Sequence, residues 1–144
     1  IAGPDENGYR STLESLLEAE GVLKNTIFTN TLEGNDKLAA LARADILVQP
    51  SYSEGFSTTV LEALACGIPV LITTKCNFPE IQEMEAGKVI EPDAGNLSTA
   101  LKHMLSDSQM LKKMGENGKK LVREKYNWNM IAEQMIQFYE AILR

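Results

Sequence analysis

Two carboxylates, Glu54 and Glu62, stand with seven residues between them in the stretch PSYSEGFSTTVLEALACGIPV, residues 50–70. Gly55 allows a turn between them, and FSTT at residues 56–59 then supplies free backbone N–H groups at a predicted helix start. Such a start binds anions, so we expect a phosphate there. Glu62 lies about one turn into the helix and leans towards its N-terminus, where it can accept hydrogen bonds from a vicinal diol such as a ribose. Glu54 can reach hydroxyls on the other side of the phosphates.

A structural role for both Glu residues stays open on spacing alone. The stretch TVLE matches a capping box, with Thr59 as the N-cap and Glu62 reaching back to the N–H of Thr59. Glu54 would then be a solvated loop acid. Spacing by itself therefore does not choose between a ligand site and a helix cap.

Up to Ile90, short apolar runs alternate with helical patterns. This alternation predicts an α/β fold, with a parallel sheet covered by helices on both faces. The predicted strands are residues 1–2, 26–29, 46–49, 70–73 and 89–90, and the predicted helices are 9–20, 36–44 and 58–66.

The predicted parallel sheet also places the loops. ILVQP at residues 46–50 has three consecutive apolar residues, which is typical of a strand buried on both sides. Ligands bind beyond the carboxyl ends of such strands, so four loops should share one edge. They are GPDENG, TNTLEGND, PSYSEGFST and TKCNFPE.

After Ile90 the pattern is helical, and three amphipathic helices are predicted. The first starts at Gly95 or Asn96, a break follows at residues 106–108, and Asn127 is the N-cap of the last helix. The apolar stripes comprise Leu97, Leu101, Met104 and Leu105 in the first helix, Leu111, Met114, Leu121 and Val122 in the second, and Trp128, Ile131, Met135, Phe138 and Ile142 in the third.

Composition narrows the class of protein. The 144 residues fit one globular domain, and 14 basic against 20 acidic residues give a formal charge of −6. Long-range attraction to nucleic acid or an anionic membrane is therefore not expected. A phosphate would have to be bound by groups in direct contact with it. Cys66 and Cys76 form no metal spacing and are predicted to be buried thiols.

The ends and the hydropathy of the chain suggest its setting. No apolar run approaches the roughly 18–20 residues that span a bilayer, and no signal peptide is visible, so we expect a cytoplasmic protein. The opening IAGPDE lacks an initiator Met and reads as the end of a buried strand running into a turn. We therefore expect the chain to be a fragment of a larger protein.

The stretch at residues 50–70, followed by NFPEI and AGKVIEPD, resembles the C-terminal, nucleotide-sugar-binding domain of the retaining glycosyltransferases of family four. Their hallmark is a Glu pair separated by seven residues, beside EGF and ahead of EAxAxGxPV. The resemblance runs from IAGP to YNWNMIAEQMIQFYEAIL and covers essentially the whole chain. It implies one Rossmann-like domain over residues 1–144: the C-terminal half of a GT-B fold, truncated at its N-terminus.

The resemblance also implies residue roles. Glu62 would bind the ribose hydroxyls, and Glu54 would contact the transferred sugar as the catalytic candidate. The family often has Gly where Asn30 and Ser57 stand. The remaining donor contacts implied are the backbone N–H groups around Gly55, Phe56, Ser57, Thr58 and Thr59 for the diphosphate, with the Thr58 hydroxyl as a helper, and Thr31 and Leu32 for the base.

By the same resemblance, the complete protein would be a hexosyltransferase or other glycosyltransferase of polysaccharide or glycoconjugate biosynthesis. It would use a nucleotide-diphosphate sugar as donor and need no metal, and the chain has no Asp-x-Asp pair to hold one. The acceptor domain and the phosphate-gripping Arg and Lys would precede Ile1, so the fragment alone would be inactive. The acceptor would be a carbohydrate or a lipid-linked group, with peripheral association at the cytoplasmic membrane face left open.

In that family the last helix crosses back towards the acceptor-binding domain. Partial exposure of Trp128, Phe138 and Tyr139 is therefore one expectation, and ordinary core packing is the other.

Two other functions stay open. One is a GT-B nucleotide-sugar epimerase, and the other is a non-catalytic binding module in which the two Glu residues only cap the helix and contact solvent. His103 is expected on the surface. Lys75, Asn77 and Glu80 follow the fourth predicted strand, where ligand contact and an ordinary surface turn are both open.

Overall fold

The computed structural model describes residues 1–143. Two compact units divide the chain, the first covering Ile1–Ala39 and the second starting at Ala40.

The first unit contains helix α1 (Tyr9–Ala19), the 3-10 turns Glu6–Gly8 and Leu23–Asn25, and the beginning of α2 (Gly34–Ala42). The predicted helix at residues 9–20 is thus confirmed, whereas the predicted helix at 36–44 begins and ends two residues earlier.

The two strands predicted for the first unit are wrong as regular strands. Their segments nevertheless face each other: the amino group of Ile1 donates to the Ile27 carbonyl at 2.7 Å, and the amide of Thr29 donates to the Ile1 carbonyl at 3.1 Å. This is the pairing pattern of parallel strands, over too few residues to form a ladder.

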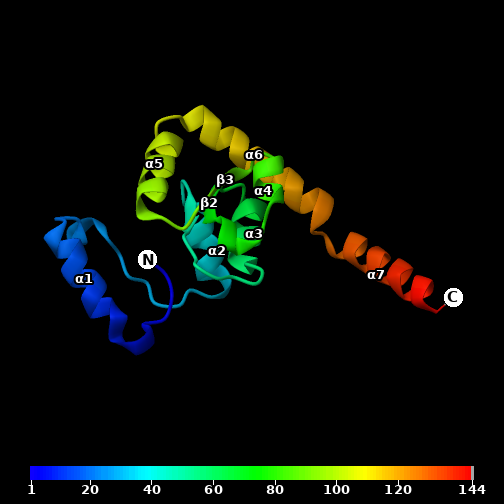
Figure 1. The fold of residues 1–144 in the computed structure, drawn as a ribbon, viewed down its shortest axis with the longest axis horizontal. Coiled ribbons are helices and arrows are strands. Elements are labelled where there is room, and N and C mark those ends of the chain that lie inside the picture. Colours follow the sequence, from blue (N-terminus) through cyan, green and yellow to red (C-terminus); the bar gives the residue numbers. More distant parts are fainter. Residues whose placement is uncertain (144) are drawn as a thin grey trace. The chain divides into compact units, whose positions relative to one another are not determined.

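A parallel three-stranded sheet forms the centre of the second unit (Figure 1). Its strands are β1 (Leu47–Gln49), β2 (Val70–Thr73) and β3 (Gly87–Ile90), in the order β1-β2-β3. The helices are α3 (Thr58–Cys66), α4 (Glu80–Glu83), α5 (Ala94–Leu105), α6 (Ser108–Lys125) and α7 (Trp128–Ile142), with a 3-10 turn at Thr74–Cys76. The strands predicted at 46–49, 70–73 and 89–90 and the helix at 58–66 are therefore confirmed to within two residues.

Helices cover both faces of β2, as the sequence predicts. Val70 and Ile72 belong to the core cluster that contains Val60 and Leu64 of α3. Leu71, between them, points to the other face and packs with Met104 of α5 and Met114 of α6. All four residues of β2 are buried, because alternate side chains of a strand enter the two cores in turn.

The prediction that ILVQP is buried on both sides is wrong for Val48. Val48, in the middle of β1, is 36% exposed. Leu47 packs against the core cluster beneath α3, but Val48 points to the opposite face and joins neither cluster. Ile46, just before β1, does pack against the second cluster, so that face of the run is covered at Ile46 and left uncovered at Val48.

Side-chain caps mark the starts of the last three helices. Asp93 accepts from the Asn96 amide at 2.9 Å, Asp107 from the Met110 amide at 3.0 Å, and Asn127 from the Met130 amide at 3.0 Å. The predicted break at 106–108 and the Asn127 cap are thus confirmed, while the first of these helices starts at Ala94, one residue early. Leu105 was expected in the core but is 57% exposed, because the neighbouring Met104 takes the inward position.

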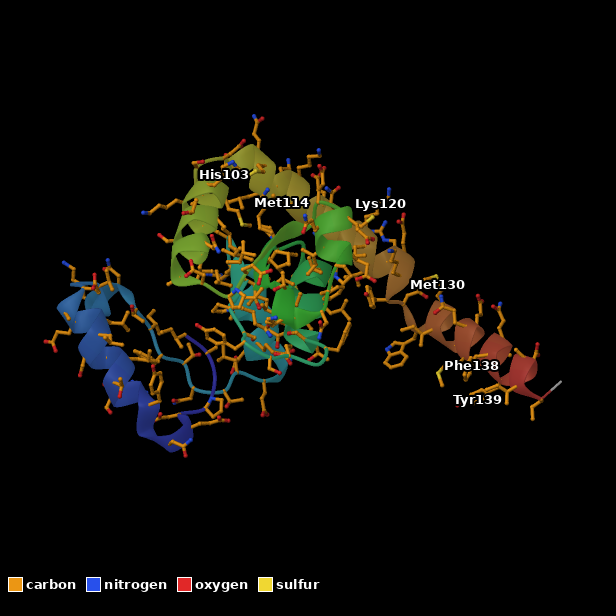
Figure 2. The ribbon with its side chains drawn as sticks, viewed as in Figure 1. His103, Met114, Lys120, Met130, Phe138 and Tyr139 are labelled. Carbon is orange, nitrogen blue, oxygen red and sulfur yellow. The ribbon has the colours of Figure 1, made fainter. Side chains whose placement is uncertain are left out.

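The core prediction for the stripe of α7 is wrong. Figure 2 shows Phe138 and Tyr139 projecting from α7, and they are 63% and 56% exposed, while Trp128 is 84% exposed. No residue of α7, which the structure describes in full, is buried. The partial exposure that was the alternative expectation for Trp128, Phe138 and Tyr139 is confirmed.

Candidate functional site

The loops that follow β1 and β2 meet at one edge of the sheet, as predicted. The Glu54 amide donates to the Lys75 carbonyl at 3.2 Å, and the Asn77 side-chain amide donates to the Glu54 carbonyl at 3.3 Å. The Thr73 hydroxyl also donates to the Ser51 carbonyl. Asn77 has a φ of 49°, a left-handed conformation that Asn tolerates better than most residues. The backbone of Glu54 is therefore fixed from both sides by the loop after β2.

Helix α3 starts with Ser57 as its N-cap, not Thr59. Ser57 is extended (φ −86°, ψ 104°) and its buried hydroxyl accepts from the Val60 amide at 3.2 Å. The predicted capping box is wrong, because Thr59 already has its place inside the helix and Glu62 is two residues beyond the position from which a box residue reaches back. A capping-box role for Glu62 is thereby removed.

The first amides of α3 are available to a ligand. Besides the Val60 amide, which Ser57 caps, the Leu61 amide bonds to the Ser57 carbonyl at 3.2 Å. Within residues 1–143, no acceptor bonds to the amides of Thr58 and Thr59. Two N–H groups at the positive end of a helix dipole thus lack a protein acceptor, an arrangement that favours an anion.

Gln49, the last residue of β1, ties the carboxylate of Glu54 to this helix start. Its side-chain amide nitrogen donates to Glu54 Oε2 at 2.8 Å, and its oxygen accepts from the Ser57 hydroxyl at 2.8 Å. Glu54 is half-buried and is held at three points: its amide, its carbonyl and its carboxylate. Glu62, also half-buried, follows on α3.

An aromatic cluster of Phe56, Phe78 and Tyr126 supports the same loop. The ring centroids lie 5.4 Å apart for Phe56 and Phe78, 5.8 Å for Phe56 and Tyr126, and 5.3 Å for Phe78 and Tyr126. Phe78 is buried, and Phe56 is 49% exposed. Burial raises the pKa of Tyr126 to about 12, and the charge of Glu80 and a hydrogen bond to it add to the effect.

The other predicted contacts are distributed as follows. Gly55, Phe56 and Thr58 are exposed, Thr59 is half-buried and Ser57 is buried, all at the start of α3. Thr31 is exposed and Leu32 is half-buried in the first unit, so their contact with a base stays a prediction.

The two positions where the resembled family often has Gly behave differently. Asn30 has a φ of 55°, in the left-handed region where Asn can stand in for Gly. Ser57 is extended, a conformation that needs no Gly, and its hydroxyl does the capping.

Several further expectations can be placed. His103 is exposed on α5 (Figure 2), as predicted. Both cysteines are free thiols; Cys76 is buried as predicted, but Cys66 is only half-buried. Across residues 1–143, His, Cys, Asp and Glu side chains form no group of three that could hold a metal ion, and no helix has the length and apolar character needed to cross a membrane.

The site residues that sequence reasoning missed are Gln49, Phe78 and Tyr126. The signal for Gln49 was present, because a polar residue ends an otherwise apolar strand at the ligand edge. Tyr126 and Phe56 are 70 positions apart (126 − 56), and no local pattern pairs them.

Comparison with known proteins gives a consistent result. The family described as Glycosyl transferases group 1 matches residues 1–121. A GDP-mannose-dependent monoacylated alpha-(1-6)-phosphatidylinositol monomannoside mannosyltransferase of Corynebacterium glutamicum is 33% identical over 92% of this chain, which covers 36% of that protein. The chain spans about a third of the length of the curated relatives it matches.

Two solved structures share the fold. Sucrose-phosphate synthase from Thermosynechococcus elongatus superposes with a TM-score of 0.81 at 29% identity, covering 98% of this chain and 37% of that one. The C-terminal domain of a glycosyl transferase group 1 family protein from Francisella tularensis superposes with a TM-score of 0.74 at 31% identity, covering 87% of this chain and 66% of that one. The sheet flanked by helices matches the GT-B fold of such glycosyltransferases.

Proposed function

Because the chain belongs to the Glycosyl transferases group 1 family, we propose that it is the donor-binding domain of a retaining glycosyltransferase of family four. The complete enzyme moves a sugar from a nucleotide-diphosphate sugar to an acceptor, in the cytoplasm. The relative from Corynebacterium glutamicum is named as GDP-mannose-dependent, which supports a donor of this class.

The observation that carries the proposal is the start of α3. Two amides, those of Thr58 and Thr59, have no acceptor within residues 1–143, and Glu54 is held beside them by three hydrogen bonds. A diphosphate fits the amides, and a polyhydroxylated group fits the carboxylate. Glu62 is no capping-box residue, which supports its assignment to the ribose hydroxyls.

In this arrangement each residue has a separate role. The amides from Gly55 to Thr59 bind the diphosphate, Glu54 binds the sugar, and Thr31 and Leu32 contact the base. The acceptor attacks the sugar on the face from which the nucleoside diphosphate leaves, and the configuration at the sugar carbon is retained. Fixed N–H dipoles stabilise the negative charge that develops on the departing diphosphate, at no cost of reorganisation.

The acceptor belongs to another part of the protein in this proposal. The exposed apolar side chains of α7, among them Trp128, Phe138 and Ile142, support packing of this helix against an acceptor-binding domain. That domain would bind a carbohydrate or a lipid-linked acceptor, and any association with a membrane surface would depend on it.

The proposal can be tested by adding GDP, UDP and ADP separately to the isotope-labelled protein. We expect at least one nucleotide to shift the amide signals of Phe56 to Thr59 and the side-chain signals of Glu62. Amides of α5, on the other side of the sheet, should not move and serve as the internal control. Unchanged signals at saturating concentrations of all three nucleotides would refute the donor site.

A matched pair of variants separates ligand binding from stability. Glu62→Gln should weaken nucleotide binding by roughly tenfold, because a carboxylate accepts stronger hydrogen bonds from the two hydroxyls of a diol than a side-chain amide does. Its melting temperature should stay close to that of the wild type. Glu116→Gln, the same change at an exposed position of α6, should alter neither property. If Glu62→Gln changed only the melting temperature, Glu62 would be structural.

A further inference from the structure

The side chain of Gln49 lies where two parts of the proposed donor site meet. It is the last residue of β1, paired in register with Ile72 of β2, so its backbone is held in the sheet and not in a loop. Its side chain spans from Ser57, the N-cap of α3, to Glu54, on the preceding loop. A rigid strand thus carries the group that joins the two.

The chemistry of the partners fixes which end of the Gln49 amide faces which residue. An ionised carboxylate only accepts hydrogen bonds, so the NH₂ group must face Glu54 Oε2. The amide oxygen is then left to accept from Ser57, whose own oxygen already accepts from the Val60 amide. The serine hydroxyl therefore has one arrangement that satisfies every partner.

These bonds form one directed chain. The Val60 N–H donates to Ser57, the Ser57 hydroxyl donates to Gln49, and Gln49 donates to Glu54, over distances of 3.2, 2.8 and 2.8 Å. Bonds that point the same way polarise one another, so the helix start and the carboxylate strengthen each other. The chain of hydrogen bonds ends on one carboxylate oxygen of Glu54, Oε2.

We propose that Gln49 is a positioning residue for donor recognition: it holds the Glu54 carboxylate in the orientation that binds the sugar of a nucleotide-diphosphate sugar. This inference rests on the proposed function. Gln49 acts through Glu54 and not through the phosphate-binding amides. Its removal should therefore affect binding of the sugar and leave binding of the nucleotide largely intact.

The test measures dissociation constants of the complete protein for GDP and GDP-mannose and for UDP and UDP-glucose, by titration calorimetry. The readout is the ratio of the nucleotide-sugar constant to the nucleoside-diphosphate constant. Gln49→Met keeps the length of the side chain and removes both hydrogen bonds. Gln49→Glu keeps an acceptor for Ser57 and removes the donor to Glu54. Both variants should raise the ratio by roughly tenfold, the effect of losing a hydrogen bond to a charged group.

Two controls separate positioning from general damage. Gln109→Met makes the same change at an exposed position of α6 and should leave the ratio unchanged. Adding Gln49→Met to a Glu54→Gln variant should raise the ratio by no more than about twofold, because residues that act as one unit are not additive. Full additivity would mean that Gln49 does not act through Glu54.

The outcomes distinguish this inference from the function on which it rests. If the wild-type protein bound none of the four nucleotides, the proposed function would fail, and the role of Gln49 with it. If the wild type bound them and both Gln49 variants kept its ratio, only the role of Gln49 would be overturned. Equal weakening of nucleotide and nucleotide sugar would likewise overturn it, since that result indicates damage to the helix start. Should Gln49→Met fail to fold, Gln49→Glu decides.

Discussion

Replacing Gly115 by Ala should destabilise the second unit, although Ala is the better helix former. Gly115 is buried in α6, against the C-terminal end of α3. A Cβ atom at this position would lie 2.1 Å from the carbonyl oxygen of Gly67, a distance that folded proteins do not tolerate. The oxygen belongs to the backbone, and Gly67 is itself the left-handed C-cap of α3, with a φ of 81°. An Ala side chain at this position can therefore be accommodated only if α3 and α6 move apart.

Two opposing terms set the expected size of the effect. Ala is favoured over Gly inside a helix by about 1 kcal/mol. Overpacking a core costs about 1–3 kcal/mol, and a clash with backbone belongs at the upper end of that range. The net loss in the free energy of unfolding should therefore be about 2 kcal/mol, which corresponds to a fall in melting temperature of roughly 4–8 °C at this chain length.

Urea unfolding followed by circular dichroism would measure this loss, with Gly118→Ala as the matched control. Gly118 lies in the same helix and is also buried, but its added Cβ would meet the Leu64 Cδ2 atom at 2.9 Å. That atom is the end of a flexible side chain and can rotate away, so Gly118→Ala should stay within about 1 kcal/mol of the wild type. Equal stabilities for the two variants, or a gain for Gly115→Ala, would refute the reasoning.

Two other predictions concern the site. Ser57→Ala should lower the free energy of unfolding, measured by urea titration, by about 2 kcal/mol, because it removes the cap on the Val60 amide and the donor to Gln49. Ser57→Thr keeps a hydroxyl and should retain most of the wild-type stability. A loss below about 0.5 kcal/mol for Ser57→Ala would contradict this role of Ser57. Tyr126, whose pKa is raised to about 12 from an unfolded value of about 10, contributes stability that is complete below pH ~10 and is lost as the pH rises towards ~12. Wild-type stability should therefore fall relative to Tyr126→Phe across that window, and parallel pH curves for the two proteins would show that burial beside Glu80 has no such effect.

Local patterns were enough to predict most of the elements of the second unit. Runs of apolar residues predicted β2 and β3, and amphipathic spacing predicted α3, α5 and α6, because the periods of strands and helices are written directly into the order of residues. The alternation of these elements predicted a parallel sheet with helices on both faces, which the structure shows. The Asn127 cap was likewise a local signal.

Local patterns failed where burial depends on what lies opposite. Val48 has an apolar type and an apolar neighbourhood in sequence, but neither core cluster covers it. The stripe of α7 has the same spacing as the buried face of α6, yet none of its residues is buried. Periodicity shows that a face is apolar and does not show which surface covers it.

The Glu54 and Glu62 pair, the turn at Gly55 and the helix that follows could be identified from the sequence alone, because all three lie within one short segment. Tertiary structure alone decided how they work together. It made Ser57 the N-cap in place of Thr59, since the hydroxyl of Ser57 bonds to Val60 and to Gln49 at once. Gln49 and Glu54 are only five residues apart, but their side chains meet because of the path that the backbone takes between the end of β1 and the start of α3, which residue types and spacing do not fix.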